Sequence, residues 1–383
     1  MQKRKTKKTS KFMNNQIDFT LCITILLLLA LGIIMVLSAS APSALAESGN
    51  SYTYVSKQLT LAIVGLFAMM FISKIDYRFY KKYYWTIYWF SCAILLLVKV
   101  PFLGRTVNGA TRWIVLGPIQ LQPSEITKIG MIIFFAGYLT DHKKEITSLV
   151  GGIIKPLCWL AIPISLLFFV QNHLSVSMVI GLVTLIMIIM AGCRLIYFAV
   201  AGGIGIVGVA GALIYMNATD SGGFRMQRIV SFMNPWADAQ GTGWQVIQSL
   251  YAIGSGGLFG VGLGESKQKY LYIPEPHNDF IFSILAEELG FVGCAVVIIL
   301  FAIFIWRGIV IAMRAPDMFG SLMATGSTAL VAVQVVINIA VVTSSMPATG
   351  MPLPFFSYGG TALLILLCCM GILLNISRAG SKV

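Results

Sequence analysis

Long apolar runs alternate with short polar segments along almost the whole chain. Each run is close to the ~20 residues that an α-helix needs to cross the hydrocarbon core of a bilayer. The pattern therefore predicts an all-α integral membrane protein, a polytopic bundle of about ten transmembrane helices. The predicted spans lie at about residues 17–41, 57–74, 83–100, 124–140, 150–170, 175–192, 195–216, 278–306, 319–343 and 359–377.

Composition excludes a soluble globular protein. Of the 383 residues, 57% are hydrophobic and only 11% are charged, whereas about a quarter are charged in a typical soluble domain. The net charge of +13 would suggest nucleic acid for a soluble domain, but in a membrane protein positive charge is interpreted by its position relative to the bilayer. We therefore expect no nucleic-acid partner. The seven cysteines have neither disulfide-framework nor zinc-site spacing.

The basic residues predict which side of the membrane each loop occupies. When the sides alternate from span to span, most of the 27 Lys and Arg residues fall on the side of residues 1–16, and short basic loops are typically cytoplasmic. We expect a multi-pass protein of the cytoplasmic membrane with both termini cytoplasmic: basic tail 1–16, one membrane domain 17–378 and tail 379–383. Outer loops are expected at 101–123 and, between the seventh and eighth helices, at 217–276.

One stretch, Tyr270 to Gly290, carries five titratable groups: Glu275, His277, Asp279, Glu287 and Glu288. Ionisable groups at membrane depth are costly, so their default interpretation is functional. We expect Asp279 at the outer mouth of the bundle, and the two glutamates more than two turns inside, where they hold helices together. For Asp279 the structural alternative is a charge favoured by the dipole at a helix N-terminus.

Polar residues elsewhere in the apolar runs have local explanations. Glu125 and Lys128 stand at i and i+3, which allows an ion pair on one helix face. Gln334 and Asn338, at i and i+4, are expected to join neighbouring helices. The spacing of apolar residues in 243–253 predicts a surface-lying or re-entrant helix followed by a glycine turn.

Six basic residues of the outer loops lie where the phosphate-bearing head group of a lipid would be. Guanidinium and ammonium groups bind pyrophosphate well, and ordinary solvated loop charge is the alternative. His142 and His173 are isolated and expected to be solvated or loop-capping, and no set of three metal ligands can be assembled from the sequence. The six basic candidates are Arg105, Arg112, Arg225, Arg228, Lys267 and Lys269.

Four long motifs in order resemble the SEDS family of shape, elongation, division and sporulation proteins, which includes FtsW, RodA and SpoVE. The resemblance covers Ile17 to Arg378, and the runs GLGES and HND resemble FtsW and SpoVE more than RodA. The motifs are GATRWIVLGPIQLQPSE, NPWADAQGTGWQVIQSLYAIGSGGLFGVGLGES, PEPHNDFIFSILAEELGF and GMPLPFFSYGGTALLILLCCMGILLNISR.

The resemblance implies a ten-helix peptidoglycan glycosyltransferase that polymerises lipid II into lipid-linked glycan on the outer face of the cytoplasmic membrane. It implies a class B penicillin-binding protein, a transpeptidase, as partner, with other divisome or sporulation membrane proteins. Asp279 matches the catalytic aspartate of the family, and Glu125 and Lys128 match its PSE-x-x-K motif. We predict that these two residues, His277 and Ser357 bind substrate with the basic loop residues.

The reaction that we expect is inverting, with Asp279 as the base that deprotonates the 4-hydroxyl of the incoming lipid II sugar. A divalent cation, Mg or Mn, held by Asp279 or another acid would help to stabilise the pyrophosphate. Two alternatives from other classes stay open: a lipid II flippase, and a scaffold without chemistry of its own for the transpeptidase. Many relatives carry an acid in a PDLGT-like stretch where this chain has Asn172 to Val176, so no role is transferred there.

Overall fold

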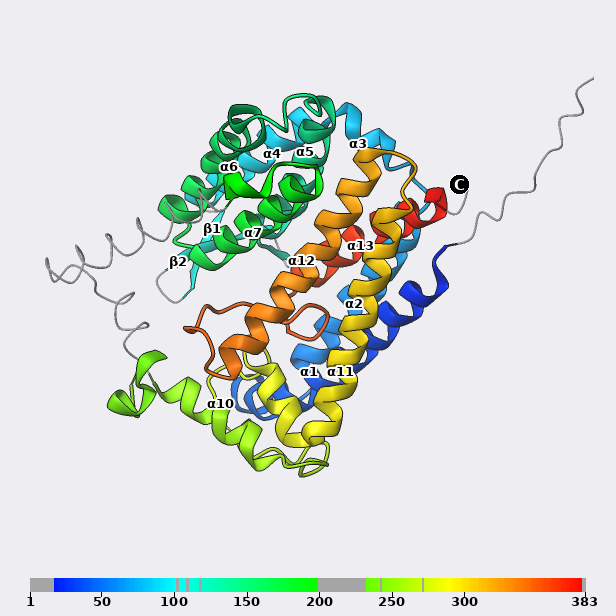
Figure 1. Ribbon diagram of the computed structural model, residues 1–383. Helices are drawn as coiled ribbons and strands as arrows, with labels where there is room; N and C mark the ends of the chain where they lie inside the picture. Colours follow the sequence, from blue (N-terminus) through cyan, green and yellow to red (C-terminus); the bar gives the residue numbers. More distant parts are fainter. Residues whose placement is uncertain are drawn as a thin grey trace, which may run out of the picture.

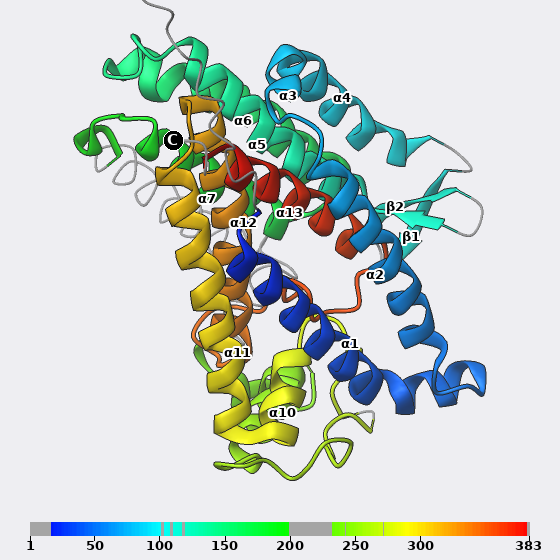
Figure 2. The ribbon, with the colours of Figure 1, turned by 90° about the vertical axis from the view of Figure 1, so that its right-hand side faces the viewer.

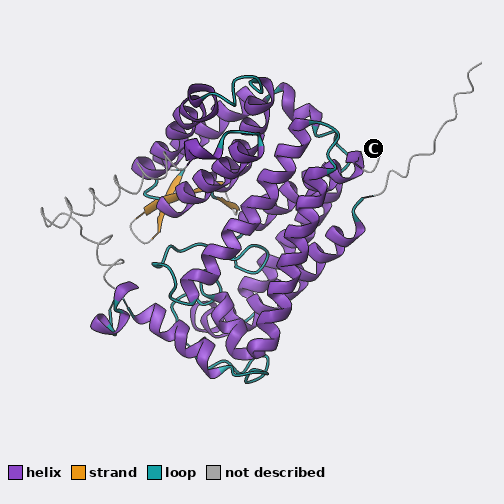
Figure 3. Cartoon of the chain, in the orientation of Figure 1, coloured by secondary structure: helices purple, strands orange, loops and turns teal. Residues whose placement is uncertain are grey.

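The structure is a computed structural model that describes residues 17–100, 103–107, 110–116, 119–198, 232–241, 243–270 and 272–380. Within these ranges the chain is a bundle of long helices (Figures 1 and 3), so the predicted all-α membrane class is confirmed. Most of the predicted span at 195–216 lies outside the described residues.

Each of the other predicted spans corresponds to a helical segment, and π-helical turns at Val150–Ile154 and Leu166–Val170 extend α6 at both ends. Among the described residues, 6 helices are long and apolar enough to cross a membrane. The chain is therefore a multi-pass membrane protein. The helices are α1 (Phe19–Ser48), α2 (Thr53–Ile72), α3 (Arg78–Lys82), α4 (Tyr84–Leu96), α5 (Pro123–Asp141), α6 (Lys155–Ser165), α7 (Leu174–Met190), α10 (Trp244–Ser255), α11 (Ile281–Met313), α12 (Met318–Val342) and α13 (Thr361–Gly380).

Helix α12 is the centre of the bundle and packs against α5, α7, α11 and α13 (Figure 1). Its side chains are largely buried, including Phe319 and Leu330. The outward faces of α2 and α11 instead expose large apolar side chains such as Phe67 and Phe291. A broad exposed apolar surface of this kind is typical of a face that contacts lipid.

The first predicted outer loop contains a small antiparallel sheet, which the pattern of apolar runs did not predict. Its strands are β1 (Gly104–Val107), β2 (Ala110–Leu116) and β3 (Ile119–Leu121), in the order β1-β2-β3. The sequence did contain a signal, because Asn-Gly between β-branched residues favours a hairpin. The sheet gives the basic residues of this loop fixed positions.

Helix α11 is sharply bent at Gly290, which has φ 66° and ψ −165°. Glycine adopts this conformation without a steric penalty. The segment Gly257 to Gly262 lies against the bend, with hydrogen bonds from Val261 N to Glu287 O (3.0 Å) and from Phe291 N to Gly257 O (2.9 Å). Figure 2 shows the start of α11 beside α10, at the opposite end of the molecule from α3.

This bend decides what surrounds Glu287 and Glu288. In a straight helix both residues would lie about two turns after Asp279, in line with the long part of α11 that follows Gly290. Instead the helix is bent directly after them, and both side chains are buried and bonded to residues 266–269. Their predicted role of holding segments together agrees with these contacts.

The beginning of α1 and the end of α13 lie together at one end of the bundle. Asp18 caps α1 by accepting a hydrogen bond from Leu21 N (2.9 Å), and its own backbone N donates to Ser377 Oγ (3.1 Å). The guanidinium of Arg307 on α11 pairs with the same carboxylate. This arrangement agrees with an even number of membrane crossings between residues 18 and 377.

Candidate functional site

The loop of residues 350–358 between α12 and α13 is the centre of the candidate site. It lies directly on α1, where a Cβ atom on Gly32 would be only 2.2 Å from Phe355 O. Phe355 has φ 67°, a left-handed conformation that costs a residue with a side chain of order 1–3 kcal/mol. The surrounding packing therefore maintains a backbone that the loop alone would not favour.

We expect Gly32→Ala to destabilise the protein by about 1–3 kcal/mol, because the added methyl overlaps the Phe355 carbonyl and forces the loop or α1 to move. Thermal unfolding in detergent, followed by tryptophan fluorescence, measures the change. Gly181→Ala is the matched control, since its Cβ would meet only Ile164 Cδ1 at 3.9 Å. Equal melting temperatures for the two variants would contradict the close packing of loop and helix.

Asp279 lies two residues before α11 and is half-buried beside this loop. Its carboxylate is over the backbone of Gly350, where an added Cβ would be 3.2 Å from Asp279 Oδ2. Gly350 has φ 69°, which favours glycine, and the missing side chain leaves room for the carboxylate. The predicted general base is thus a carboxylate at the edge of the bundle, next to a loop that packing holds in place.

Ser357 connects the loop to the Asp279 segment. Its hydroxyl donates to Asn278 O (2.7 Å) and accepts a hydrogen bond from Leu353 N (2.7 Å). The single hydroxyl proton is therefore used within the protein. This geometry contradicts a role for Ser357 as a hydrogen-bond donor to substrate and makes it a support for the neighbouring backbone.

His277 is buried between two tyrosine rings. Its ring centroid is 4.6 Å from that of Tyr54 on α2 and 5.7 Å from that of Tyr358. Burial lowers the pKa of His277, although the nearby carboxylates of Glu275 and Glu47 oppose the shift. A neutral imidazole packed in this way supports the loop and gives no positive charge to a pyrophosphate.

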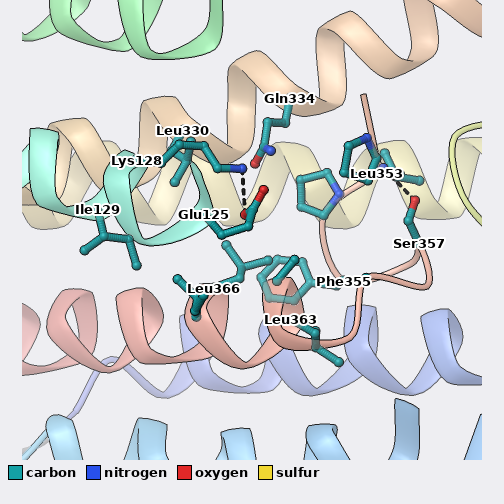
Figure 4. A pocket seen from close by; sticks show the side chains of 15 residues that line it. Glu125, Lys128, Ile129, Leu330, Gln334, Leu353, Phe355, Ser357, Leu363 and Leu366 are labelled. Carbon is teal, nitrogen blue, oxygen red and sulfur yellow. Dashed lines mark hydrogen bonds and ion pairs between the residues drawn. The ribbon is translucent and has the colours of Figure 1, made fainter. Parts of the chain in front are cut away.

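The predicted ion pair between Glu125 and Lys128 on α5 is confirmed. Lys128 Nζ is 2.7 Å from Glu125 Oε2, and the side chains are only 3% and 10% exposed, respectively. The pair faces a cavity of about 40 Å³ whose lining includes Gln334, Ser357 and Leu363 (Figure 4). Since one water needs roughly 10–15 Å³ of such space, the cavity admits a few waters.

The two sheet arginines differ in what they contact. Arg112 donates to the carbonyl oxygens of Gln171 (3.3 Å) and Asn172 (2.7 Å) and so fixes the turn before α7. Arg105 on β1 is exposed. Of the two predicted pyrophosphate ligands in this loop, Arg105 is therefore the more accessible.

His173 is buried at the start of α7, which contradicts the solvated alternative and leaves the loop-capping one. Its Nε2 is 3.1 Å from Gln122 Nε2. Burial, together with the positive charges of Arg112 and Lys128, lowers the pKa of His173 to about 3. The imidazole therefore stays neutral in the folded protein at any physiological pH.

The low pKa of His173 predicts a pH-dependent stability. Because the folded pKa is below the unfolded value of about 6.5, the unfolded state binds the extra proton first, and stability falls as pH drops from about 6.5 toward 3. Between pH 7.5 and 5.5 this group should contribute a loss of about 1.4 kcal/mol. Melting curves of the wild type and His173→Gln measure it: the variant should lose less stability on acidification, and an unchanged slope would contradict the assignment.

Lys269 is not available to a substrate. Its ammonium is bonded to Glu288 Oε1 (2.8 Å), Gly264 O (2.6 Å) and Ser38 Oγ (3.1 Å), and its side chain is 4% exposed. All three ammonium protons are therefore used inside the protein. This contradicts the prediction that Lys269 binds pyrophosphate.

Lys267, by contrast, has an exposed side chain, while its backbone N donates to Glu287 Oε1 (2.9 Å). The same carboxylate accepts a hydrogen bond from Ser266 Oγ. Glu287 thus folds this segment so that the Lys267 ammonium points to solvent. Arg225 and Arg228, the other predicted basic ligands, lie outside the described residues.

Comparison with known proteins identifies the family. The model of the FtsW/RodA/SpoVE cell cycle proteins matches residues 19–382, nearly the whole chain. The chain belongs to this family. The expected resemblance is thereby confirmed, and the matched range includes every site residue described above.

Two curated relatives of the family cover almost the full length. Stage V sporulation protein E of Bacillus subtilis is 44% identical over 376 residues, 97% of this chain and 98% of that protein. The probable peptidoglycan glycosyltransferase FtsW of Trichlorobacter lovleyi is 40% identical over 365 residues, 95% of this chain and 94% of that protein.

Solved structures of family members share the fold. A chain from a study of a peptidoglycan synthase complex that coordinates polymerization and crosslinking has a TM-score of 0.77 at 27% identity, covering 95% of this chain and 98% of that chain. The rod shape determining protein RodA of Thermus thermophilus has a TM-score of 0.69 at 26% identity, covering 94% and 97%.

Two residues of the site had no functional prediction. Tyr54, on the face of His277, gave no signal in an apolar helix with several aromatic residues. Asn338 did give a signal as a polar residue in an apolar span, but spacing alone suggested contact between helices. In the structure its amide contacts the Asp279 segment and the 350–358 loop instead.

Proposed function

We propose that this member of the family is a peptidoglycan glycosyltransferase that polymerises lipid II, with Asp279 as the general base. The observation that carries the proposal is a half-buried carboxylate on a backbone held by the 350–358 loop, at the position of the catalytic aspartate of the family. The relatives that are named probable peptidoglycan glycosyltransferases support the same activity.

The chemistry needs a base and a place for a departing pyrophosphate. Asp279 takes the proton from the 4-hydroxyl of the acceptor sugar, and the oxygen attacks the anomeric carbon of the donor from the face opposite the pyrophosphate. The C–O bond to the pyrophosphate breaks, its electron pair leaves with the pyrophosphate, and the configuration inverts. Positive charge at the leaving group lowers the barrier.

Among the basic residues in the described parts of the outer loops, we propose that Arg105 and Lys267 bind the pyrophosphate, because their side chains are exposed. Both have the charge for this task. Arg225 and Arg228 remain predicted contributors. Glu125 and Lys128 line a cavity beside the 350–358 loop and remain predicted contributors to substrate binding.

A resident divalent cation does not fit the described site. Among the described residues, no group of three or more His, Cys, Asp or Glu side chains could hold a metal ion. Mg²⁺ can also be bound by one or two carboxylates together with substrate phosphates and water. We therefore propose Mg or Mn as a companion of the pyrophosphate near Asp279.

For the assembled enzyme we propose a class B penicillin-binding protein as partner, because a structural neighbour comes from a peptidoglycan synthase complex. Other divisome or sporulation membrane proteins are further proposed partners. The basic tail at residues 1–16 and the short basic loops favour cytoplasmic termini. This orientation would place α10, the sheet and Asp279 at the outer face of the cytoplasmic membrane.

Reconstitution of the full chain with lipid II tests the proposed activity. Purified protein in liposomes, with and without the partner transpeptidase, is incubated with labelled lipid II, and products are separated by size. We expect glycan polymer. Its formation should not require the transpeptidase activity of the partner. Lipid II that crosses the bilayer without polymer would favour the flippase alternative, and absence of both activities would favour a scaffold.

A further inference from the structure

Three successive backbone carbonyls hold the segment that carries Asp279. His277 O accepts a hydrogen bond from Tyr358 N (2.9 Å) and Asn278 O accepts one from Ser357 Oγ (2.7 Å). Asp279 O accepts the third from Asn338 Nδ2 (2.8 Å). This segment is not helical, because α11 begins only at Ile281, so these three bonds replace the regular pattern that would otherwise fix its backbone.

Only one of the three donors comes from a helix. Tyr358 and Ser357 belong to the same loop, whose own conformation includes the left-handed Phe355. Asn338 lies in α12, the centre of the bundle, and is 1% exposed. The second proton of its amide goes to Met351 O (2.7 Å), so one nitrogen ties both the Asp279 segment and the loop to the rigid helix.

The chemistry of the position requires an amide. Both neighbours are carbonyl oxygens, so only the NH₂ group can face them. A carboxylate there would place negative charge against two acceptors. Asn338 Oδ1, meanwhile, is buried without a hydrogen-bond partner among the described residues, and such an unsatisfied acceptor lowers stability. The amide of Asn338 therefore costs stability through its Oδ1, while its two N–H groups bond the Asp279 segment and the loop.

We propose that Asn338 is a positioning residue of the enzyme: its amide fixes the Asp279 backbone and so sets where the carboxylate meets the acceptor hydroxyl. The inference rests on the proposed glycosyltransferase activity. A general base must be within hydrogen-bond reach of the proton that it removes, and a displacement of about 1 Å can lower a rate by about 100-fold. Loss of the amide should therefore reduce the rate of reaction rather than substrate binding.

The test measures lipid II polymerisation by full-length Asn338→Leu with the partner present. We expect kcat per folded enzyme to fall about 10- to 100-fold while KM stays within about threefold. Thr328→Val is the matched control, a buried position on the same helix whose hydroxyl donates to Ala324 O in its own helix. Its kcat should stay within about twofold of the wild type. Melting temperatures verify that each variant is folded.

Asn338→Ser provides a second measurement if the leucine variant does not fold, because one donor remains. Its kcat should lie between those of the leucine variant and the wild type. A folded leucine or serine variant with wild-type kcat, or one in which only KM changes, overturns the inference. Wild-type protein that makes no polymer, with or without the partner, would instead refute the proposed activity itself.

Discussion

Glu288→Gln is expected to destabilise the protein by about 3–5 kcal/mol, because it leaves the buried ammonium of Lys269 without its counter-charge. The pair is 2.8 Å apart, and the two side chains are 4% and 0% exposed. Ser38 on α1 donates to the same carboxylate (2.6 Å), so the substitution also weakens the contact between α1 and the bend in α11. Thermal unfolding in detergent should show a clearly lower melting temperature.

Two controls separate burial from simple loss of charge. Glu145 and Lys155 form an ion pair with the same 2.8 Å distance, but the side chains are 48% and 49% exposed. Glu145→Gln should therefore change the melting temperature little. The double variant Lys269→Met/Glu288→Leu should recover much of the loss, since no buried charge remains. Equal effects of the buried and exposed substitutions would contradict the structural role of Lys269.

Asp279→Asn is expected to lower kcat for lipid II polymerisation by about 10²- to 10⁴-fold, the usual contribution of a positioned general base. Asparagine has nearly the same shape, so it should preserve the surrounding backbone bonds while removing the ability to accept the proton. KM should change much less than kcat, because the lost interaction belongs to the transition state. Initial rates with labelled lipid II and the partner transpeptidase provide the measurement.

Glu265→Gln is the charge-matched control for this experiment. Glu265 is an exposed carboxylate in the loop before the Asp279 segment, and removal of its charge should leave kcat within about twofold. A comparable loss of kcat in both variants would indicate that the net charge of the loop controls the rate. It would contradict the role of Asp279 as the base.

The features that could be predicted from the sequence are local. Apolar runs of membrane length identified the helices because each run satisfies its own backbone hydrogen bonds. The ion pair between Glu125 and Lys128 followed from their i, i+3 spacing on one helix. The position of Asp279 near the start of a helix also needed only nearby residues and the family motif.

The features that could not be predicted depend on partners far apart in the chain. Ser38 and Glu288 are 250 residues apart, and nothing in the loop around Lys269 indicates that its ammonium is enclosed by them. Similarly, the motif residue Ser357 resembled a substrate ligand until its hydroxyl was found bonded to Asn278 O. Periodicity predicted a helix through Glu287 and Glu288, but it did not predict the bend at Gly290 that follows them.

The pH dependence of polymerisation tests the central claim most directly, because the acid limb of a kcat/KM profile reports the essential base of the free enzyme. With the wild type we expect activity to fall as pH decreases and the Asp279 carboxylate becomes protonated. The residual activity of folded Asp279→Asn should lack that acid limb. The same acid limb in both proteins, or wild-type activity in the variant, would contradict Asp279 as the general base.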